Sequence, residues 1–329
     1  MIKKIKIGSK FPCFIIAEIG INHGGSFDRA NKLVEEAFNC GANAVKFQIA
    51  NPHKSYQKGT PSYKEFIKSS LDFDEYKRII KKFERRGEIF ATPGDIESLK
   101  LCKKLNLNIY KVSSGLVNNL VLIREIAKTK MPIILSTGMA SLKEINDAVK
   151  IAKKYGSKEV HLLHCTSIYP APSNLLNLDK ILMLKNKTNL NIGYSDHHLG
   201  IDASTTAVAM GAKIIEKHFT LDNNMVGADH KISLNPIEFK KMVSKIRKIE
   251  LLKGKIDAKF NKIEQNNAKK FRRYCVASKD INIGDKFTLD NVCFMRVRAR
   301  KNAIPASHFL KIENKKANEL CKKLKIIEK

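Results

Sequence analysis

The sequence lacks the features that mark several common classes of protein. No apolar run approaches the roughly 18 residues that span a bilayer. The apolar stretch over residues 14–17 is short and runs into Glu18 without a small-residue cleavage site, so neither a membrane span nor export is expected. The seven cysteines are scattered and form no CxxC pair, which argues against a disulfide framework or a zinc ribbon. The predicted compartment is therefore the reducing cytoplasm.

Acidic residues are scarce beside basic ones, and tryptophan is absent. The chain has 61 Lys and Arg against 32 Asp and Glu, which gives a formal charge of +29. A basic surface can indicate nucleic-acid binding, but these lysines are spread along the whole chain and no aromatic–basic stacking motif accompanies them. We attribute the positive charge to a general bias toward lysine. This explanation is compatible with attraction of an anionic substrate. A nucleic-acid partner is not expected, and it would require steeply salt-dependent binding.

A repeated pattern of short apolar runs, each followed by an amphipathic segment, occupies most of the chain. Each run is apolar without alternation, which is typical of a strand that is buried on both faces. The runs cover residues 14–18, 44–48, 88–93, 109–114, 132–137, 160–165, 191–196 and 213–218.

The segments between the runs predict helices. NKLVEEAFNCGA places apolar residues at helical spacing before a glycine stop, and LKEINDAVKIAKKYG repeats this with Ser141 as a candidate N-cap. Eight strand–helix units in series predict an α/β protein with a (β/α)₈ TIM barrel. We assign residues 1–255 to this barrel, 256–272 to a charged linker with some helix, and 273–329 to a small β-rich domain. A domain of that size is marginally stable alone, so we expect it to pack on the barrel or on a partner subunit.

Polar residues follow or end nearly every predicted strand. In a TIM barrel the chemistry lies at the carboxyl ends of the strands. A ring of polar groups from separate apolar strands is hard to explain by packing alone. The candidates are Glu18, Lys46, Gln48, Thr92, Lys111, Ser114, Ser136, His164, Ser195, His197 and His218.

Two kinds of site can be predicted among these candidates. His197 and His218 end neighbouring strands, and two imidazoles suit a divalent transition metal with open positions. His198 should point elsewhere. Lys46 and Lys111, with nearby hydroxyl groups, are suited to bind phosphate and carboxylate. The alternatives are histidines satisfied by hydrogen bonds and ordinary lysines at the rim of the barrel. The loop GADHK at residues 227–231 either covers the site or is plain solvated loop.

Ordered motifs along nearly the whole chain resemble those of the sialic acid synthase family. They read FIIAEIGINHGGSFDRA, AVKFQ, ATPGD, YKVSSG, PIILSTGM, LLHCTSIYPAP, IGYSDHHLG, EKHFTLD and GADHKISL, and the region after Arg273 resembles the family's C-terminal antifreeze-like (SAF) domain. The resemblance implies condensation of phosphoenolpyruvate with an N-acetylmannosamine-like amino sugar to a nonulosonic, sialic-type acid. Carbon 3 of phosphoenolpyruvate attacks the sugar aldehyde, water adds at carbon 2, and phosphate leaves. Mn²⁺, or else Mg²⁺ or Co²⁺, polarises the aldehyde as a Lewis acid.

The resemblance also implies roles for particular residues. In the family the small domain of one subunit caps the barrel of its partner and delivers an arginine to the sugar, so a domain-swapped homodimer is expected. The implied roles are metal binding for His197 and His218; phosphoenolpyruvate binding for Lys46, Thr92, Lys111, Ser114, Ser136 and Ser195; sugar binding for Tyr169 and Arg296; polar contacts at the condensation site for Glu18 and Gln48; and proton transfer for Asp229.

Two departures from the family pattern lie on the sugar side. The family has Gly-Glu after the serine matched to Ser114, whereas this chain has Gly115-Leu116, and leucine accepts no hydrogen bond from a sugar hydroxyl. In the family the arginine is followed by Pro-Gly-x-Gly, whereas here the sequence from Arg296 reads RVRARKNAIP. We expect the chemistry to be kept and the sugar to be altered, for example to a deoxygenated bacillosamine-type sugar that gives a legionaminic-like product.

Two other functions remain as alternatives. A related phosphoenolpyruvate-dependent aldol synthase that acts on a sugar phosphate would need a second cationic site, and the small C-terminal domain argues against it. A catalytically silent, sugar-binding barrel is compatible with Leu116, but the histidine pair and the two lysines argue against it.

Overall fold

The computed structural model describes residues 6–254, 261–298 and 302–328. The chain divides into two compact units, Met1–Gly254 and Lys255–Lys329, each of which is described by itself. Among the residues that the model describes, no helix is long and apolar enough to cross a membrane.

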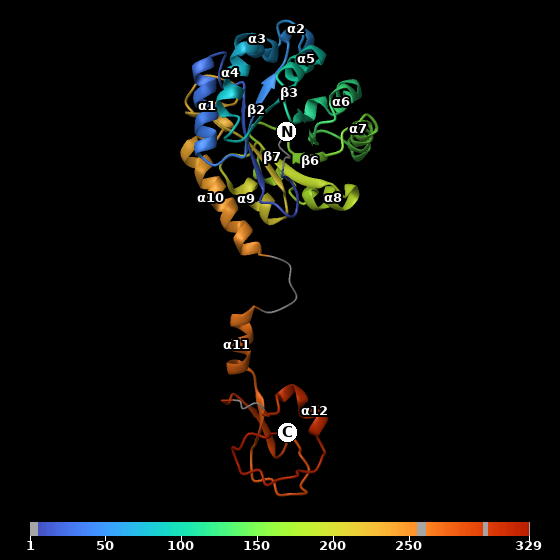
Figure 1. The fold of residues 1–329 in the computed structure, drawn as a ribbon, viewed down its shortest axis with the longest axis vertical. Helices are drawn as coiled ribbons and strands as arrows, with labels where there is room; N and C mark the ends of the chain where they lie inside the picture. The colour runs from blue at the N-terminus through green and yellow to red at the C-terminus, as the bar shows by residue number, and fades with distance from the viewer. Residues whose placement is uncertain (1–5, 255–260, 299–301, 329) are drawn as a thin grey trace. The chain divides into compact units, whose positions relative to one another are not determined.

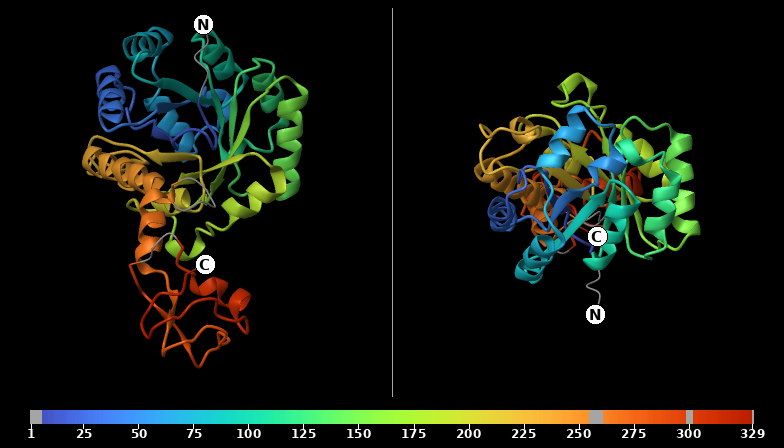
Figure 2. Two further views of the ribbon diagram at one scale, coloured as in Figure 1. Left: turned by 60° about the horizontal axis from the view of Figure 1, so that its bottom comes forward. Right: turned by 90° about the horizontal axis from the view of Figure 1, so that it is seen from above.

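The larger unit is a closed barrel of eight parallel strands in sequence order, with helices around it (Figures 1 and 2). All eight predicted strands are confirmed, which also confirms the predicted TIM barrel. The strands are β1 (Phe14–Gly20), β2 (Ala44–Ile49), β3 (Glu88–Pro93), β4 (Tyr110–Val112), β5 (Ile133–Ser136), β6 (Val160–Cys165), β7 (Asn191–Asp196) and β8 (Ile214–His218).

Most helices of this unit begin at polar caps that the sequence encodes. Ser141 caps α7 and forms a capping box with Glu144, as the sequence predicts, and Asn235 with Glu238 does the same for α10. The helices are α1 (Phe27–Asn39), α2 (Pro52–Ser55), α3 (Pro61–Lys68), α4 (Phe73–Phe83), α5 (Ile96–Lys104), α6 (Leu120–Ala127), α7 (Leu142–Lys154), α8 (Lys180–Thr188), α9 (Asp202–Ala209) and α10 (Pro236–Lys253).

The interior of the barrel changes from apolar to polar along the strands. An apolar cluster that includes Ile16, Phe90, Ile134 and Ile214 fills the lower interior. Because side chains alternate across a strand, the residues two positions further along point into the same interior. Those residues are Glu18, Thr92, Ser136 and Glu216, all of them buried. The strand period therefore places a polar layer directly above this apolar cluster, and the polar layer forms the floor of the barrel's open end.

The smaller unit has its own core and little regular structure. The helix α11 (Lys262–Phe271) lies in the segment predicted as linker, and β9 (Tyr274–Ala277) pairs antiparallel with β10 (Val292–Met295). Isolated bridges and the short helix α12 (Phe309–Ile312) complete its described part. Its core contains Cys275, Ile281, Val292, Phe309 and Cys321.

Candidate active site

Four charged side chains form a buried cluster inside the barrel. Lys46 Nζ lies 2.9 Å from Glu18 Oε2 and 3.5 Å from Glu216 Oε2. Lys111 Nζ donates to Glu216 Oε1 at 3.1 Å. All four side chains are nearly inaccessible to solvent. Buried charges are tolerated only when they are paired, and here each carboxylate has a lysine partner.

The pKa values of Glu18 and Glu216 are shifted in opposite directions, although both carboxyl groups pair with Lys46. Burial raises the pKa of Glu18 to about 7, against the lowering effect of Lys46. Burial also disfavours ionised Glu216, but Lys111 and Lys46 outweigh it and lower the pKa to about 2. Two carboxyl groups whose pKa values are pushed apart are typical of acid–base chemistry. Near neutral pH Glu18 can hold or release a proton, whereas Glu216 stays ionised.

Hydroxyl groups and an amide surround this cluster. Lys46 Nζ donates to Thr92 Oγ1 at 3.1 Å, and Ser195 Oγ donates to Glu216 Oε1 at 3.0 Å. Gln48 Nε2 donates to Glu18 Oε1 at 2.9 Å. The structure thus brings together residues from β1, β2, β3, β4 and β7 whose proximity the sequence predicted, and adds Glu216 from β8, which was not predicted.

Ser136 and Ser114 also lie near the cluster, and they differ in whether the hydroxyl group has a hydrogen-bond partner. Ser136 Oγ is buried without a hydrogen-bond partner in the described residues, so it is free to bind a ligand atom. Ser114 Oγ accepts from the backbone N–H of Gly138 at 3.1 Å. A Cβ at position 138 would lie 2.8 Å from that oxygen and 2.4 Å from Ser167 Oγ, so only glycine allows this approach.

The histidine pair lies beside the charged cluster at the end of the barrel. The ring centroids of His197 and His218 are 5.5 Å apart. His197 Nδ1 donates to the carbonyl oxygen of Thr166 at 2.9 Å, so Nε2 is the nitrogen that can bind a metal. Burial lowers the pKa of His218 to about 4, so this ring is neutral. Its Nδ1 has no hydrogen-bond partner in the described residues, and the Asp229 carboxylate lies 3.6 Å away.

These two rings could serve as nitrogen ligands of a divalent metal ion. An imidazole binds a metal through a nitrogen that carries no proton, and each ring has a nitrogen that is not committed to a hydrogen bond in the described residues. In the part of the chain that the model describes, no group of three His, Cys, Asp or Glu side chains surrounds a common point. The protein would therefore supply two nitrogen ligands, and other positions would be left for substrate oxygen and water.

Tyr169 joins the histidines to an open cavity. Its ring stacks on His197 at a centroid distance of 4.1 Å and meets His218 edge-on at 6.4 Å. It also lines a cavity of about 600 Å³ with Gln48, Thr92 and Leu116. Because Gln48 and Thr92 hydrogen-bond to the charged cluster, this cavity adjoins the cluster. Among the described residues, no lysine or arginine lines it.

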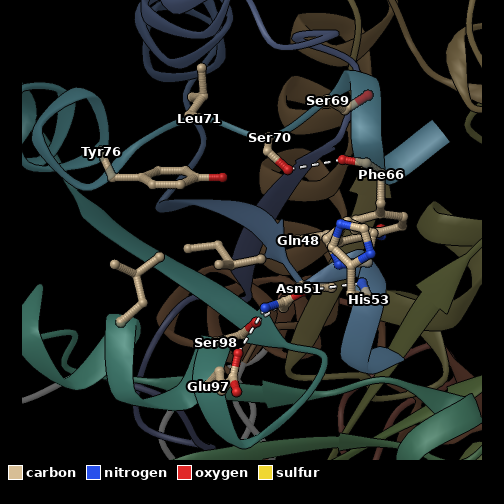
Figure 3. A pocket seen from close by; sticks show the side chains of 14 residues that line it. Gln48, Asn51, His53, Phe66, Ser69, Ser70, Leu71, Tyr76, Glu97 and Ser98 are labelled. Atoms are coloured by element: carbon tan, nitrogen blue, oxygen red, sulfur yellow. Dashed lines mark hydrogen bonds between the residues drawn. The ribbon is translucent and has the colours of Figure 1, made fainter. Parts of the chain in front are cut away.

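A second cavity, of about 420 Å³, adjoins the first (Figure 3). It lies among the ends of β2 and α3, the start of α4 and the start of α5. The two cavities share Gln48, Ile49, Ala50 and Phe66. No sequence pattern marks this cavity, because the residues on its walls come from loops and helix ends with ordinary patterns.

Some sequence expectations are corrected or fall outside this site. His164 was expected to face the site, but its Nε2 bonds the carbonyl oxygen of Leu176 at 2.7 Å on the outer side of β6, because Leu163 occupies the inward position. His198 turns away, as predicted, and its Nδ1 bonds the carbonyl oxygen of Ala171. Arg296 belongs to the smaller unit, where its guanidinium stacks on Phe271 at 4.7 Å.

Sequence reasoning missed Glu216 and a buried ion pair next to the histidines. Lys217 Nζ lies 3.1 Å from Asp196 Oδ2, fully buried, and also donates to the carbonyl oxygen of His198. Asp196 accepts from the backbone N–H of His198 and from Ser204 Oγ. These bonds fix the chain on both sides of His197. The missed signal was the alternation in β8, which puts Glu216 on the same inward face as His218.

Comparisons with known proteins agree with this architecture. The model of the NeuB family matches residues 33–258. An N,N'-diacetyllegionaminic acid synthase of Campylobacter jejuni is 42% identical over 323 residues, which cover 93% of this chain and 97% of that protein. The crystal structure of an N-acetylneuraminic acid synthetase from Leptospira borgpetersenii, in complex with citrate, superposes with a TM-score of 0.78 at 36% identity, over 81% of this chain and 94% of that one. The fold is also shared, with a TM-score of 0.84, by a putative spore coat polysaccharide biosynthesis protein of Chromobacterium violaceum at 22% identity, over 96% and 98% of the two chains. This chain therefore belongs to the NeuB family, the sialic acid synthase family that its motifs resemble.

Proposed function

We propose that this protein is a nonulosonic acid synthase that condenses phosphoenolpyruvate with an N-acylated amino sugar and releases phosphate. One observation carries the proposal. A buried cluster of two lysines and two carboxyl groups lies beside a pair of metal-competent histidines. Gln48 and Thr92, which bond the cluster, and Tyr169, which stacks on His197, line one cavity. The similarity to legionaminic and neuraminic acid synthases supports the reaction.

Phosphoenolpyruvate binds to the charged cluster in this proposal. Lys46 and Lys111 supply the ammonium groups, and the free hydroxyl of Ser136 supplies a donor. With Glu18 protonated the cluster has one positive charge in excess, because Glu216 alone opposes the two lysines. A protonated Glu18 therefore favours entry of the anion, and Ser114, Ser195 and Thr92 complete the polar walls.

Glu18 moves a proton during the reaction. Its pKa of about 7 lets it hold a proton at its carboxyl group and give it up near neutral pH. Gln48 donates to one carboxyl oxygen of Glu18 and lines the cavity of about 600 Å³, which is the acceptor cavity in this proposal. Asp229, whose carboxylate lies 3.6 Å from His218, is the second candidate for proton transfer. Glu216, which stays ionised, keeps Lys111 oriented.

His197 and His218 hold the divalent metal, for which Mn²⁺ is the first choice and Mg²⁺ or Co²⁺ the alternatives. When bound there, the metal supplies Lewis-acid polarisation of the sugar aldehyde. Tyr169, stacked on His197, orients the sugar against this pair.

The acceptor is an uncharged, acylated and deoxygenated sugar of the legionaminic type. Leu116 presents an apolar wall to the acceptor cavity at the position where the family has a carboxylate. A second phosphate on the sugar would meet no lysine or arginine in that lining, which disfavours a sugar-phosphate acceptor. The intact cluster and histidine pair likewise disfavour a silent binding barrel.

The smaller unit is proposed to be the antifreeze-like cap. In a domain-swapped homodimer it would bring Arg296 to the sugar bound in the partner's barrel. We propose a cytoplasmic enzyme without nucleic-acid or membrane partners.

Phosphate release tests this proposal. Purified protein is mixed with phosphoenolpyruvate and either N-acetylmannosamine or a 2,4-diacetamido-trideoxyhexose, with Mn²⁺, Mg²⁺, Co²⁺ or EDTA. We expect sugar-dependent release that EDTA abolishes. No release with any sugar from folded, metal-loaded protein would contradict the proposal.

A further inference from the structure

The cavity beside the acceptor cavity has a lining that suits a neutral, partly apolar ligand group. Its volume of about 420 Å³ lies in the range of roughly 300–1,000 Å³ that is usual for small-molecule sites. Ile49, Leu71 and Leu101 supply apolar surface, and the phenol oxygen of Tyr76 points into the space (Figure 3). The described lining has no lysine or arginine, so a phosphate or carboxylate would be left without a partner.

The polar walls of this cavity are held in place by Asp95. Its carboxylate accepts from the backbone N–H of Asn51 at 2.8 Å and from Ser55 Oγ at 2.7 Å. It also accepts from the backbone N–H and the hydroxyl of Ser98. Burial opposes ionisation of Asp95, but the hydrogen bonds from Ser98, Ser55 and Asn51 hold its pKa below the usual range. The wall is thus preorganised by one carboxylate that ties the loop after β2 to the start of α5.

The remaining polar groups match an amide. Asn51 already donates to Glu97 at 2.7 Å, so the charged residue of the lining is engaged. Ser70 Oγ donates to the carbonyl oxygen of Phe66 at 2.9 Å and keeps lone pairs that can accept an amide N–H. An acylamino group combines such an N–H with a methyl group that suits the apolar surface.

We propose that this cavity binds a second acylamino group of the acceptor sugar, remote from the aldehyde. The inference rests on the proposed synthase function. It follows from the shared walls: Gln48 contacts Glu18 at one end and lines both cavities, and Phe66 also lines both. A sugar in the larger cavity, with its aldehyde toward the histidines, therefore places a distal substituent in the smaller one.

A cavity-filling variant tests the assignment. Ser70 is an exposed residue that follows α3 and lines the cavity, so Ser70→Trp adds volume there without removing a core residue. We expect KM for the 2,4-diacetamido sugar to rise by about tenfold or more, since losing a fitted group in a pocket has effects of this size. KM for phosphoenolpyruvate and kcat/KM for N-acetylmannosamine should stay within about twofold of the unmodified enzyme, a change too small to indicate a lost contact. The matched control is Lys68→Trp, at an exposed position outside the lining.

The outcomes separate this inference from the function on which it rests. If the unmodified enzyme consumes neither sugar, the synthase function is wrong. If it consumes both sugars with equal kcat/KM, or if Ser70→Trp affects both sugars equally or neither, the function stands and the acylamino site is overturned.

Discussion

The floor of the barrel and the two cavities at its rim differ in electrostatics: the floor is charged, and the cavity walls are largely neutral. On the floor, Lys46 and Lys111 are buried with Glu18 and Glu216, and the paired nitrogen and oxygen atoms lie 2.9–3.5 Å apart. At the rim, the linings of both cavities contain no lysine or arginine, and Leu116 and Phe66 supply apolar surface. If the proposed function holds, anion binding and sugar selection are assigned to separate parts of this barrel. Changes on the floor should disable the reaction, and changes at the rim should redirect it.

The largest effect is expected from Lys111→Met. The change leaves Glu216 with Lys46 and Ser195 as its only described partners, and breaking a buried pair costs about 3–5 kcal/mol. Thermal unfolding and phosphate release should both report the loss, with activity essentially abolished. The control is Lys143→Met, which breaks an exposed pair with Asp147 and should cost less than about 1 kcal/mol. Equal effects of the two changes would contradict the described floor.

The next largest effect is expected from His197→Gln, which should lower the reaction rate and metal binding. Losing a metal ligand removes several kcal/mol of transition-state stabilisation, about a thousandfold in rate. Titration of the protein with Mn²⁺ should show weakened binding. The adjacent His198→Gln is the control, because that ring bonds the carbonyl oxygen of Ala171 away from the site. Metal binding that survives His197→Gln but not His198→Gln would reverse the assignment.

A smaller change, in selectivity, is expected from Leu116→Glu. A carboxylate in the acceptor cavity can accept bonds from sugar hydroxyls, and it penalises a deoxygenated sugar that leaves it unpaired. The ratio of kcat/KM for N-acetylmannosamine to that for the 2,4-diacetamido sugar should rise by about tenfold. KM for phosphoenolpyruvate should not move. An unchanged sugar ratio would mean that position 116 does not face the sugar.

The smallest effect is expected in the pH dependence of stability. Folding raises the pKa of Glu18 from 4.5 to about 7, so the folded state binds more protons than the unfolded state between these values. The stabilisation from this group is complete below pH 4.5 and is lost as the pH rises through about 7. Glu18→Gln should therefore flatten the fall in unfolding free energy across this window in urea titrations. Glu125→Gln, on the surface of α6, should leave the slope unchanged. A slope that is the same with and without Glu18 would show that its pKa is not raised.

The fold could be predicted from the sequence because each barrel strand is a short apolar run that ends in a polar residue. The site residues Lys46, Lys111 and Ser195 followed from the same pattern, since the strand ends of a barrel converge. Two failures have one physical cause. His164 was included and Glu216 overlooked because the prediction took polar residues near strand ends without regard to the alternation that decides which side chains face inward.

Features that depend on tertiary contact were beyond the sequence. The opposite shifts of Glu18 and Glu216 arise from which lysine each carboxyl group meets. The ion pair of Asp196 and Lys217 lies between β7, β8 and α9, and nothing in the local pattern marks it. The second cavity is likewise assembled from four separate segments.

The most direct test of the account is a competition between two sugars. The enzyme receives phosphoenolpyruvate with equal amounts of N-acetylmannosamine and a 2,4-diacetamido-trideoxyhexose, and products are identified by mass spectrometry while phosphate is counted. We expect one phosphate for each new nine-carbon acid, with the diacylated acid in excess. Consumption of phosphoenolpyruvate without a nine-carbon acid, or an excess of the monoacylated product, would contradict it.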